Sequence, residues 1–579
     1  MPSSKLTSQT RQTALTQMSS QPLDILVVGG GVTGAGIALD AAARGLRVGI
    51  VEAQDWAAGT SSRSSKLVHG GLRYLYNLDF KLVAEALRER GLLLSTTAPH
   101  LVKAQPFLWP LKMPVIERTY SAVGVGMYDA LGFLGAHGHK TVPFQKHLSK
   151  AGALAAFPDV RTDSLVGAIR FYDSRVDDAR LVITLVRTAV KYGALAASRT
   201  EVVEMTRAAD GTVTGAVVDD LETGERHTIQ ARETILATGV WTEQTQQLSG
   251  GTGGLKVLAS KGIHIVVPKD RIKGSTGLFL RTEKSVLFII PWPEYWVIGT
   301  TDTPWHQELQ HPVATKEDIA YVLEHANAVL SSNLTEDDII GVYAGLRPLL
   351  QPGTMDENKS TKVSREHTVT RPAEGLTSIA GGKLTTYRVM AEDAVDFALG
   401  DRAASLPSVT TTTPLVGAEG FHAVEHLAGR IGATYNWDAT RMDHLLSRYG
   451  SAIDELTALV DADSTLGEPL ETAPNYLKAE VAYAVTHEGA LHLEDILRHR
   501  VRLSFERRDR GVESLDEVAA IAGPLLGMDQ DTLSREKDNY RAACAAEDTA
   551  EQADSDAAAA AARLAVPDLV TIVPLESAE

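Results

Sequence analysis

A short apolar run followed by a glycine turn constrains the fold of this chain more than any other feature. The run covers Leu23–Val28 and suits a buried parallel strand. The glycines Gly29, Gly31 and Gly34 follow in the spacing G-x-G-x-x-G, before an Ala-rich helical segment and a second apolar run that ends in Glu52. Such glycines permit a tight turn, a close pyrophosphate and close packing of the helix, while the carboxylate accepts from ribose hydroxyls. The pattern predicts a βαβ dinucleotide-binding fold.

Two later strand-to-turn segments favour FAD as the dinucleotide. Residues 235–239 read Ile-Leu-Ala-Thr-Gly, a small-residue turn typical of two-domain FAD enzymes, where it approaches the dinucleotide again. Residues 381–388 read Gly-Gly-Lys-Leu-Thr-Thr-Tyr-Arg after a strand-like run. A helix N-terminus aimed at the flavin pyrimidine edge would stabilise the negative charge of the reduced ring. The expected cofactor contacts here are Ala237, Thr238, Gly239, Gly382, Lys383, Leu384 and Thr385.

A polar segment at residues 61–74 predicts a loop around an anionic ligand. It reads Ser-Ser-Arg-Ser-Ser-Lys-Leu-Val-His-Gly-Gly-Leu-Arg-Tyr and so combines hydroxyls, glycines, a histidine and three cations. So many polar groups cannot fill a core, because each would need a partner there. From this loop we expect cofactor contacts by Thr60, Ser61, Ser65, Lys66, Leu67, His69 and Gly70.

Length, charge and cysteine content exclude several classes of protein. The 579 residues exceed the roughly 250–300 that one core sustains, so two or three domains are expected. The formal net charge of −17 argues against a nucleic-acid partner and against strong attraction to anionic lipid. Cys544 is the only cysteine, which rules out an intrachain disulfide and fits a reducing, cytoplasmic compartment.

Neither membrane insertion nor a structural metal is expected. No apolar run approaches the roughly 20 residues needed to cross a bilayer. Residues 1–20 lack the apolar core of a secretory signal and are expected to form a disordered tail. His487 and His492 resemble a zinc-binding helix, but their spacing is i, i+5 whereas that geometry needs i, i+4, so no metal is assigned.

Several further motifs occur in the order found in one enzyme family. They are the glycine turn with Glu52, the 61–74 segment, Lys-Gly-Ile-His-Ile-Val-Val-Pro at 261–268, Gly-Thr-Thr-Asp at 299–302, Gly-Leu-Arg-Pro-Leu at 345–349, Val-Ser-Arg at 363–365 and the 381–388 segment. Over residues 22–545 the chain resembles the FAD-dependent, respiratory glycerol-3-phosphate dehydrogenases. Ile263 is a departure, because a small serine is common there in the family.

The resemblance implies an α/β fold class with a D-amino-acid-oxidase-like FAD-binding Rossmann domain, an antiparallel-sheet substrate domain and a C-terminal α-helical domain. The domains expected are a disordered tail (1–20), an FAD-binding domain (22–104, 181–262 and 376–400), a substrate domain (105–180 and 263–375), a helical domain (401–545) and an acidic Ala-rich tail (546–579). The implied reaction is oxidation of sn-glycerol 3-phosphate to dihydroxyacetone phosphate, with a hydride passing from C2 to flavin N5.

Family contacts carried to matching positions surround the substrate with Arg73, Tyr74, His264, Thr301, Arg347, Arg365 and Lys383. Arg73 and Arg365 are expected to hold the phosphate through charge-assisted hydrogen bonds. A histidine supplies a general base near neutral pH, and His69 is preferred over His264 because it lies in the densest motif. Arg347 and Lys383 would polarise the C2 oxygen.

Some alternatives stay open at the level of sequence. The electron acceptor implied by the resemblance is a membrane quinone, reached by a peripheral enzyme on the inner face of the membrane, but an oxidase that uses oxygen shares the motifs. An FAD oxidase of a 2-hydroxy acid or amino acid needs only one cationic clamp, and a flavin-binding sensor needs no catalytic groups. The helical domain could also serve as the surface of a homodimer.

Overall fold

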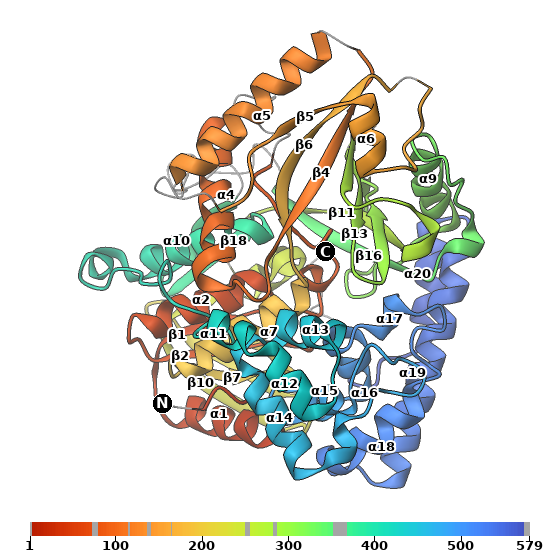
Figure 1. Cartoon of the computed structure of the whole chain (residues 1–579). Helices are drawn as coiled ribbons and strands as arrows, with labels where there is room; N and C mark the ends of the chain where they lie inside the picture. Colours follow the sequence, from red (N-terminus) through yellow and green to blue (C-terminus); the bar gives the residue numbers. More distant parts are fainter. Residues whose placement is uncertain are drawn as a thin grey trace.

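A computed structural model describes residues 3–71, 79–113, 116–135, 141–163, 165–248, 250, 255–281, 286–350 and 367–572 (Figure 1). Within them lie two large β-sheets and a mainly helical C-terminal region. Arg73, Tyr74 and Arg365, which the sequence analysis placed at the substrate phosphate, lie outside the described residues. No helix in the described part of the chain is long and apolar enough to cross a bilayer.

The first sheet carries the dinucleotide fold. Its parallel centre runs β18-β10-β1-β2-β7, with β17 antiparallel at one edge and a β8–β9 hairpin continuing from β10. The strands are β1 Leu23–Val28, β2 Val48–Val51, β7 Leu195–Ala197, β8 Thr200–Arg207, β9 Val213–Asp220, β10 Arg226–Leu236, β17 His367–Ala373 and β18 Leu376–Gly381. Packed helices α2 Val32–Ala43, α7 Asp178–Lys191 and α10 Tyr387–Leu399 bury their apolar faces in one shared core. Continuous burial of the central strands explains their unbroken apolar runs.

The second sheet has ten strands and is mostly antiparallel, as the resemblance implied. Its strands are β3 Leu67–Val68, β4 Lys103–Leu111, β5 Lys146–Ser149, β6 Gly167–Arg175, β11 Val257–Pro268, β12 Gly277–Arg281, β13 Val286–Pro291, β14 Tyr295–Gly299, β15 Thr303–Pro304 and β16 Gly341–Leu350. The helices associated with it are α4 Phe80–Leu92, α5 Ile116–Gly135, α6 Lys150–Ala156 and α9 Lys316–Asn327. Strands β11 and β16 pair along ten positions and bring two motifs that are distant in sequence side by side.

Helices make up most of the chain after residue 400. They are α11 Phe421–His426, α12 Ala428–Tyr435, α13 Ala439–Tyr449, α14 Ile453–Ala462, α15 Lys478–Thr486, α16 Leu493–Asp495, α17 Leu503–Glu506, α18 Leu515–Leu526, α19 Gln530–Glu551 and α20 Asp556–Leu564. Two apolar cores hold this region together, and Cys544 is buried in one of them as a small apolar side chain.

Both expected tails were wrong. At the N-terminus, α1 Ser8–Ser20 is a helix that buries Leu15 and Met18 against the first sheet. At the C-terminus, α19 continues to Glu551, and α20 packs against it and ion-pairs to Lys261 through Asp556. Both segments are rich in polar residues or alanine, so their average composition hid the few apolar side chains that anchor them.

Four expected domain boundaries also require correction. Those at 104/105 and 180/181 fall inside β4 and α7, so they move by two and three residues to the starts of these elements. The boundary at 262/263 falls inside β11, which is one continuous strand of the second sheet. Residues 367–375 were assigned to the substrate domain, yet β17 pairs with β18 in the FAD-binding sheet. The errors at 262/263 and 367–375 arise because a strand's sheet is decided by distant pairing partners, which local sequence does not reveal.

His492 joins the helical region to the first sheet. Its Nδ1 lies 2.6 Å from Glu536 of α19, and its Nε2 lies 2.9 Å from Glu222 in the β9–β10 turn. Burial lowers the pKa of His492, but the hydrogen bonds to Glu222 and Glu536 outweigh it and raise the pKa to about 10. The imidazolium is therefore the folded-state form at neutral pH.

We expect the stability contributed by His492 to be lost in alkali. The folded-state pKa lies above the unfolded value near 6.5, so this contribution is complete below about pH 6.5 and declines towards pH 10, by up to about 1.4 kcal/mol per pH unit. The apparent melting temperature measured from pH 6.5 to 9.5 should fall more steeply for the wild type than for His492→Gln. His422→Gln, which alters an exposed histidine 3.2 Å from Glu425, is the matched control. Parallel curves for wild type and His492→Gln would exclude the charged bridge.

Candidate active site

The glycine turn after β1 is shaped for close approach of a ligand and a second strand. Gly29 has φ = 111°, and a Cβ there would lie 2.6 Å from the Ala237 carbonyl oxygen. A Cβ on Gly34 would lie 1.8 Å from the Gly29 carbonyl oxygen, which no side chain can tolerate. Gly31 is the N-cap of α2, so the free N–H groups of the helix face the turn. The turn therefore has the geometry that a pyrophosphate requires.

Glu52 and Ser61 complete the polar surface around this turn. The Glu52 carboxylate accepts from the backbone N–H of Gly30 at 2.5 Å and of Gln54 at 2.7 Å. Burial raises the pKa of Glu52, and those two backbone donors oppose the rise. The Ser61 hydroxyl accepts from the N–H of Val32, at the start of α2. These groups hold the carboxylate where a ribose would bind and a hydroxyl where a phosphate would bind.

A cavity of about 740 Å³ extends from this turn, and we call it the dinucleotide cavity. Its volume lies within the roughly 300–1,000 Å³ typical of ligand sites. Of the expected cofactor residues, those that line it are Gly29, Gly31, Glu52, Thr60, Ser61, Ala237, Thr238, Gly239, Gly382, Lys383 and Leu384. The glycine cradle, the carboxylate and the volume fit FAD.

The other expected cofactor residues lie outside the lining; they are Gly34, Ser65, Lys66, Leu67, His69, Gly70 and Thr385. The Lys66 side chain is fully buried and donates to Asp178 at 2.7 Å, so its ammonium does not point at the cofactor. Other lining residues were not predicted from the sequence: Thr200, Glu201 and Val202 at the start of β8, Trp241, and Leu564 and Ile572 near the C-terminus. None of these residues belongs to a recognisable sequence motif. The start of β8 reaches the cavity because β7, which precedes it, pairs with β2 beside the glycine turn.

Arg347 lies in the second half of β16, next to Pro348, which lines the dinucleotide cavity. Its guanidinium donates to the Thr300 hydroxyl at 2.9 Å and the Thr301 carbonyl at 3.0 Å, and it contacts Asp302 at 3.2 Å. The Thr301 hydroxyl accepts from the Ile263 N–H, so Thr301 orients the strand and the arginine. Because Arg347 is only partly buried and its planar group is fixed on one side, it is preorganised to meet an anion or alkoxide.

His69 lies close to Lys383. The Thr385 hydroxyl bonds both the N–H and the carbonyl of His69, at 3.0 and 3.2 Å. Burial lowers the pKa of His69 to about 4; Asp173 opposes this, and Lys383 and Arg90 reinforce it. The Nδ1 atom accepts from the N–H of Gly71 at 3.1 Å. In the neutral ring the proton is therefore on Nε2, which makes His69 a hydrogen-bond donor.

His264 is the second buried histidine and lies on β11. Its Nε2 shares a hydrogen bond of 2.9 Å with the Ser65 hydroxyl, and its ring stacks on Tyr343 with centroids 4.8 Å apart. Burial holds the pKa of His264 well below its ordinary range, and Arg347 and Lys66 act in the same direction. A hydroxyl can donate to the ring nitrogen, so neutral His264 is free to act as an acceptor.

Comparison with known proteins agrees with this site. The model of the FAD-dependent oxidoreductase family matches residues 24–388, and that of the C-terminal domain of alpha-glycerophosphate oxidase matches residues 408–533. Glycerol-3-phosphate dehydrogenase 2 of Mycobacterium tuberculosis is 49% identical over 99% of this chain and 98% of that protein. The mitochondrial glycerol-3-phosphate dehydrogenase of Homo sapiens is 34% identical over 89% of this chain and 72% of that protein.

A solved structure extends the likeness to three dimensions. The glycerol-3-phosphate dehydrogenase from Bacillus halodurans, complexed with FAD, superposes with a TM-score of 0.74 at 29% identity, covering 92% of this chain and 97% of that one. The fold and the dinucleotide cavity thus define an FAD-dependent oxidoreductase. More narrowly, the chain belongs to the FAD-dependent glycerol-3-phosphate dehydrogenases. The expected fold class, cofactor and family are confirmed.

Proposed function

We propose that this protein oxidises sn-glycerol 3-phosphate to dihydroxyacetone phosphate. The observation that carries the proposal is that Lys383 lines a cavity that fits FAD, while neutral buried His69 lies near Lys383 and neutral buried His264 lies near Arg347. The formal net charge of the chain is −17, so local cations are needed to attract a phosphate dianion. Arg73 and Arg365 are proposed to complete the phosphate grip.

The residues divide the chemistry between them. When bound, FAD supplies the acceptor for the hydride that leaves C2. We assign acceptance of the C2 hydroxyl proton to His264, because within the described residues its Nε2 is hydrogen-bonded to the Ser65 hydroxyl alone, which can rotate. His69, with its proton on Nε2, is assigned as a donor to the substrate. Arg347 and Lys383 stabilise the developing alkoxide. This reverses the order of the histidines expected from sequence.

Anaerobic addition of sn-glycerol 3-phosphate to the oxidised holoenzyme tests the reaction directly. We expect the yellow flavin absorbance to bleach, with one equivalent of dihydroxyacetone phosphate formed per flavin. Lactate and amino acids should leave the spectrum unchanged, because one carboxylate does not satisfy several cations. A flavin that stays yellow with the phosphoester would reject the proposed reaction, and bleaching by an amino acid would favour the related oxidases.

We further propose that the electrons pass to a membrane quinone and that the enzyme binds the cytoplasmic face of the bilayer. Support comes from α5, which lies at the edge of the molecule opposite the helical C-terminal region (Figure 1), and from exposed apolar side chains on it and beside it. Phe133 and Phe144 are 40% and 48% exposed with ring centroids 6.1 Å apart, and Met113, just before α5, is 56% exposed. Aromatic and thioether side chains of this kind can insert into the interfacial region.

Flotation with neutral phosphatidylcholine vesicles tests this surface. The triple change of Met113, Phe133 and Phe144 to glutamine should lower vesicle binding about tenfold, since each side chain loses its apolar contact with lipid. Leu427→Gln with Leu525→Gln removes two side chains of similar exposure, 49% and 46%, on the helical region and should change nothing. Stopped-flow reoxidation should be faster with a short-chain quinone than with oxygen. Equal binding by both variants, or faster reoxidation by oxygen, would contradict the proposal.

A further inference from the structure

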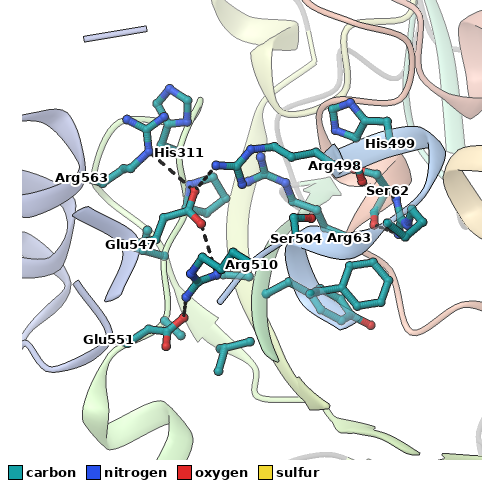
Figure 2. Close-up of a pocket in the computed structure, with 18 residues that line it drawn as sticks. Ser62, Arg63, His311, Arg498, His499, Ser504, Arg510, Glu547, Glu551 and Arg563 are labelled. Carbon is teal, nitrogen blue, oxygen red and sulfur yellow. Dashed lines mark hydrogen bonds and ion pairs between the residues drawn. The ribbon is translucent and has the colours of Figure 1, made fainter. Parts of the chain in front are cut away.

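Residues 60–63, which we call the cofactor loop, separate the dinucleotide cavity from a second, smaller cavity of about 80 Å³. We call this second cavity the arginine cavity. It is enclosed by the loop at 62–63, by β16 and by the helical region (Figure 2). Its charged lining consists of five arginines and two glutamates: Arg63, Arg498, Arg502, Arg510, Arg563, Glu547 and Glu551. The hydroxyls of Ser62 and Ser504 also line it. Arginines therefore outnumber glutamates in the lining, although the protein as a whole is acidic.

Most of these arginines have carboxylate partners. Glu547 is shared by Arg498 at 2.8 Å, Arg510 at 3.2 Å and Arg563 at 3.8 Å. Further carboxylates outside the lining pair with three of the arginines: Glu494 with Arg498, Asp548 with Arg510, and Asp568 with Arg563. Arg502 contacts Asp178 at 3.1 Å. These pairs fix the positions of the guanidinium groups around the cavity.

Arg63 differs from the others. Among the described residues, no side chain or carbonyl accepts a hydrogen bond from its guanidinium, and no dashed line reaches it in Figure 2. Burial, reinforced by the nearby Arg498 and Arg563 and opposed by Glu547 and Glu494, lowers the pKa of Arg63 to about 10. A partly buried cation that faces other cations without a hydrogen-bond partner is unfavourable, and a bound anion would relieve that cost.

We propose that the arginine cavity is a binding site for a small tetrahedral oxyanion, either inorganic phosphate or the phosphoryl group of a small phosphoester. Guanidinium groups bind such oxygens through paired N–H donors, and the hydroxyls of Ser62 and Ser504 offer further donors. The small volume excludes a nucleotide. The site is separate from the dinucleotide cavity and does not depend on the proposed substrate.

Occupancy of the arginine cavity is coupled to the cofactor loop. Thr60 and Ser61, which precede Arg63 in the same loop, line the dinucleotide cavity. The Thr60 hydroxyl donates to the Leu346 carbonyl at 2.6 Å. A Cβ on Gly345 would lie 2.6 Å from the Arg63 carbonyl oxygen, so the loop is pressed against β16. An anion bound to Arg63 thus stabilises the loop in its FAD-binding position and slows release of FAD.

The test uses full-length oxidised holoenzyme and inorganic phosphate at constant ionic strength. We expect phosphate to raise the apparent melting temperature by about 2–4 °C relative to chloride and to slow the release of FAD. Arg63→Gln should weaken phosphate binding measured by calorimetry about tenfold or more, because one charge-assisted contact is lost. Arg430→Gln, an exposed arginine on α12, should behave as the wild type.

Two further measurements make the outcome decisive. Phosphate bound near the flavin perturbs its visible spectrum and competes with substrate. Arg365→Gln removes a proposed phosphate contact of the active site, so a response that persists in Arg365→Gln but disappears in Arg63→Gln belongs to the arginine cavity. Arg563 lines the same cavity from α20. If Arg63→Gln does not retain FAD, Arg563→Gln replaces it in the test and should weaken phosphate binding in the same way. Binding of glycerol 2-phosphate as well would identify a phosphoester site, whereas binding of phosphate alone would restrict it to the free ion. Unchanged phosphate binding in a folded Arg63→Gln or Arg563→Gln protein would overturn the proposal.

Discussion

Gly34→Ala is expected to fold and yet to retain about tenfold less FAD than the wild type, with activity reduced in proportion. The added Cβ would lie 1.8 Å from the Gly29 carbonyl oxygen, a distance that only movement of backbone can relieve. Either α2 moves away from β1 or the glycine turn deforms, and both displace the N–H groups that face a pyrophosphate. The apolar core on the other side of α2 is not touched by the change, so we expect folding to survive.

FAD content is measured from the ratio of absorbance at 450 nm to that at 280 nm after gel filtration, and folding from circular dichroism. Gly429→Ala is the matched control, because a Cβ at this helical glycine meets nothing within 4 Å. Excess FAD should restore part of the activity of Gly34→Ala, since the change lowers the affinity for FAD without removing the binding cavity. Full flavin occupancy in Gly34→Ala would show that the turn does not set cofactor affinity.

The dinucleotide half of the fold was predictable because its signals are local. Leu23–Val28, the three glycines and Glu52 lie within 30 residues, and each requirement of the turn maps onto one residue type. The segments at 237–239 and 382–384 were found for the same reason, since each follows its own strand. Position along a single strand–turn–helix unit is information that sequence carries directly.

What sequence missed depended on distant partners. Lys66 was expected to face the cofactor, but its carboxylate partner Asp178 is 112 residues away. Nothing near Arg63 in sequence indicates that it turns towards Arg498 and Arg563, in helices more than 400 residues further on. The sequence analysis counted the cations of the 61–74 loop as one group. The structure places Lys66 in a buried ion pair and Arg63 at a second cavity.

The roles of the two histidines could not be separated by sequence for a related reason. Both lie in polar motifs, and both are neutral because burial lowers their pKa values. Their hydrogen bonds distinguish them: a backbone N–H can only donate, so it fixes the proton of neutral His69 on Nε2, whereas the Ser65 hydroxyl leaves His264 able to accept. Only the folded chain brings Ser65 beside His264, 199 residues away, and sets the local turn in which Gly71 donates to His69.

This difference gives the second large expected effect. His264→Gln should slow flavin reduction at saturating substrate by about 10²–10⁴-fold, because the group that accepts the hydroxyl proton is lost. His69→Gln should slow it by only about tenfold, since the glutamine amide still donates a hydrogen bond. The effect of His264→Gln should appear in kcat with KM little changed, as expected for an interaction made mainly in the transition state.

Stopped-flow flavin reduction under anaerobic conditions measures both variants, with FAD content checked first. Arg271→Gln is the control, because it removes an arginine paired with Asp338 on the surface, 44% exposed and remote from the cavity lining. If His264 is the base, a pH profile of the slow His264→Gln reaction should rise towards alkaline pH as hydroxide replaces the missing acceptor, while His69→Gln keeps the wild-type profile. If His69→Gln slows flavin reduction more than His264→Gln does, His69 is the general base. Its hydrogen bond with the Gly71 N–H must then break when substrate binds. Equal, small effects would place proton transfer on solvent, leaving Arg347 and Lys383 to stabilise the alkoxide alone.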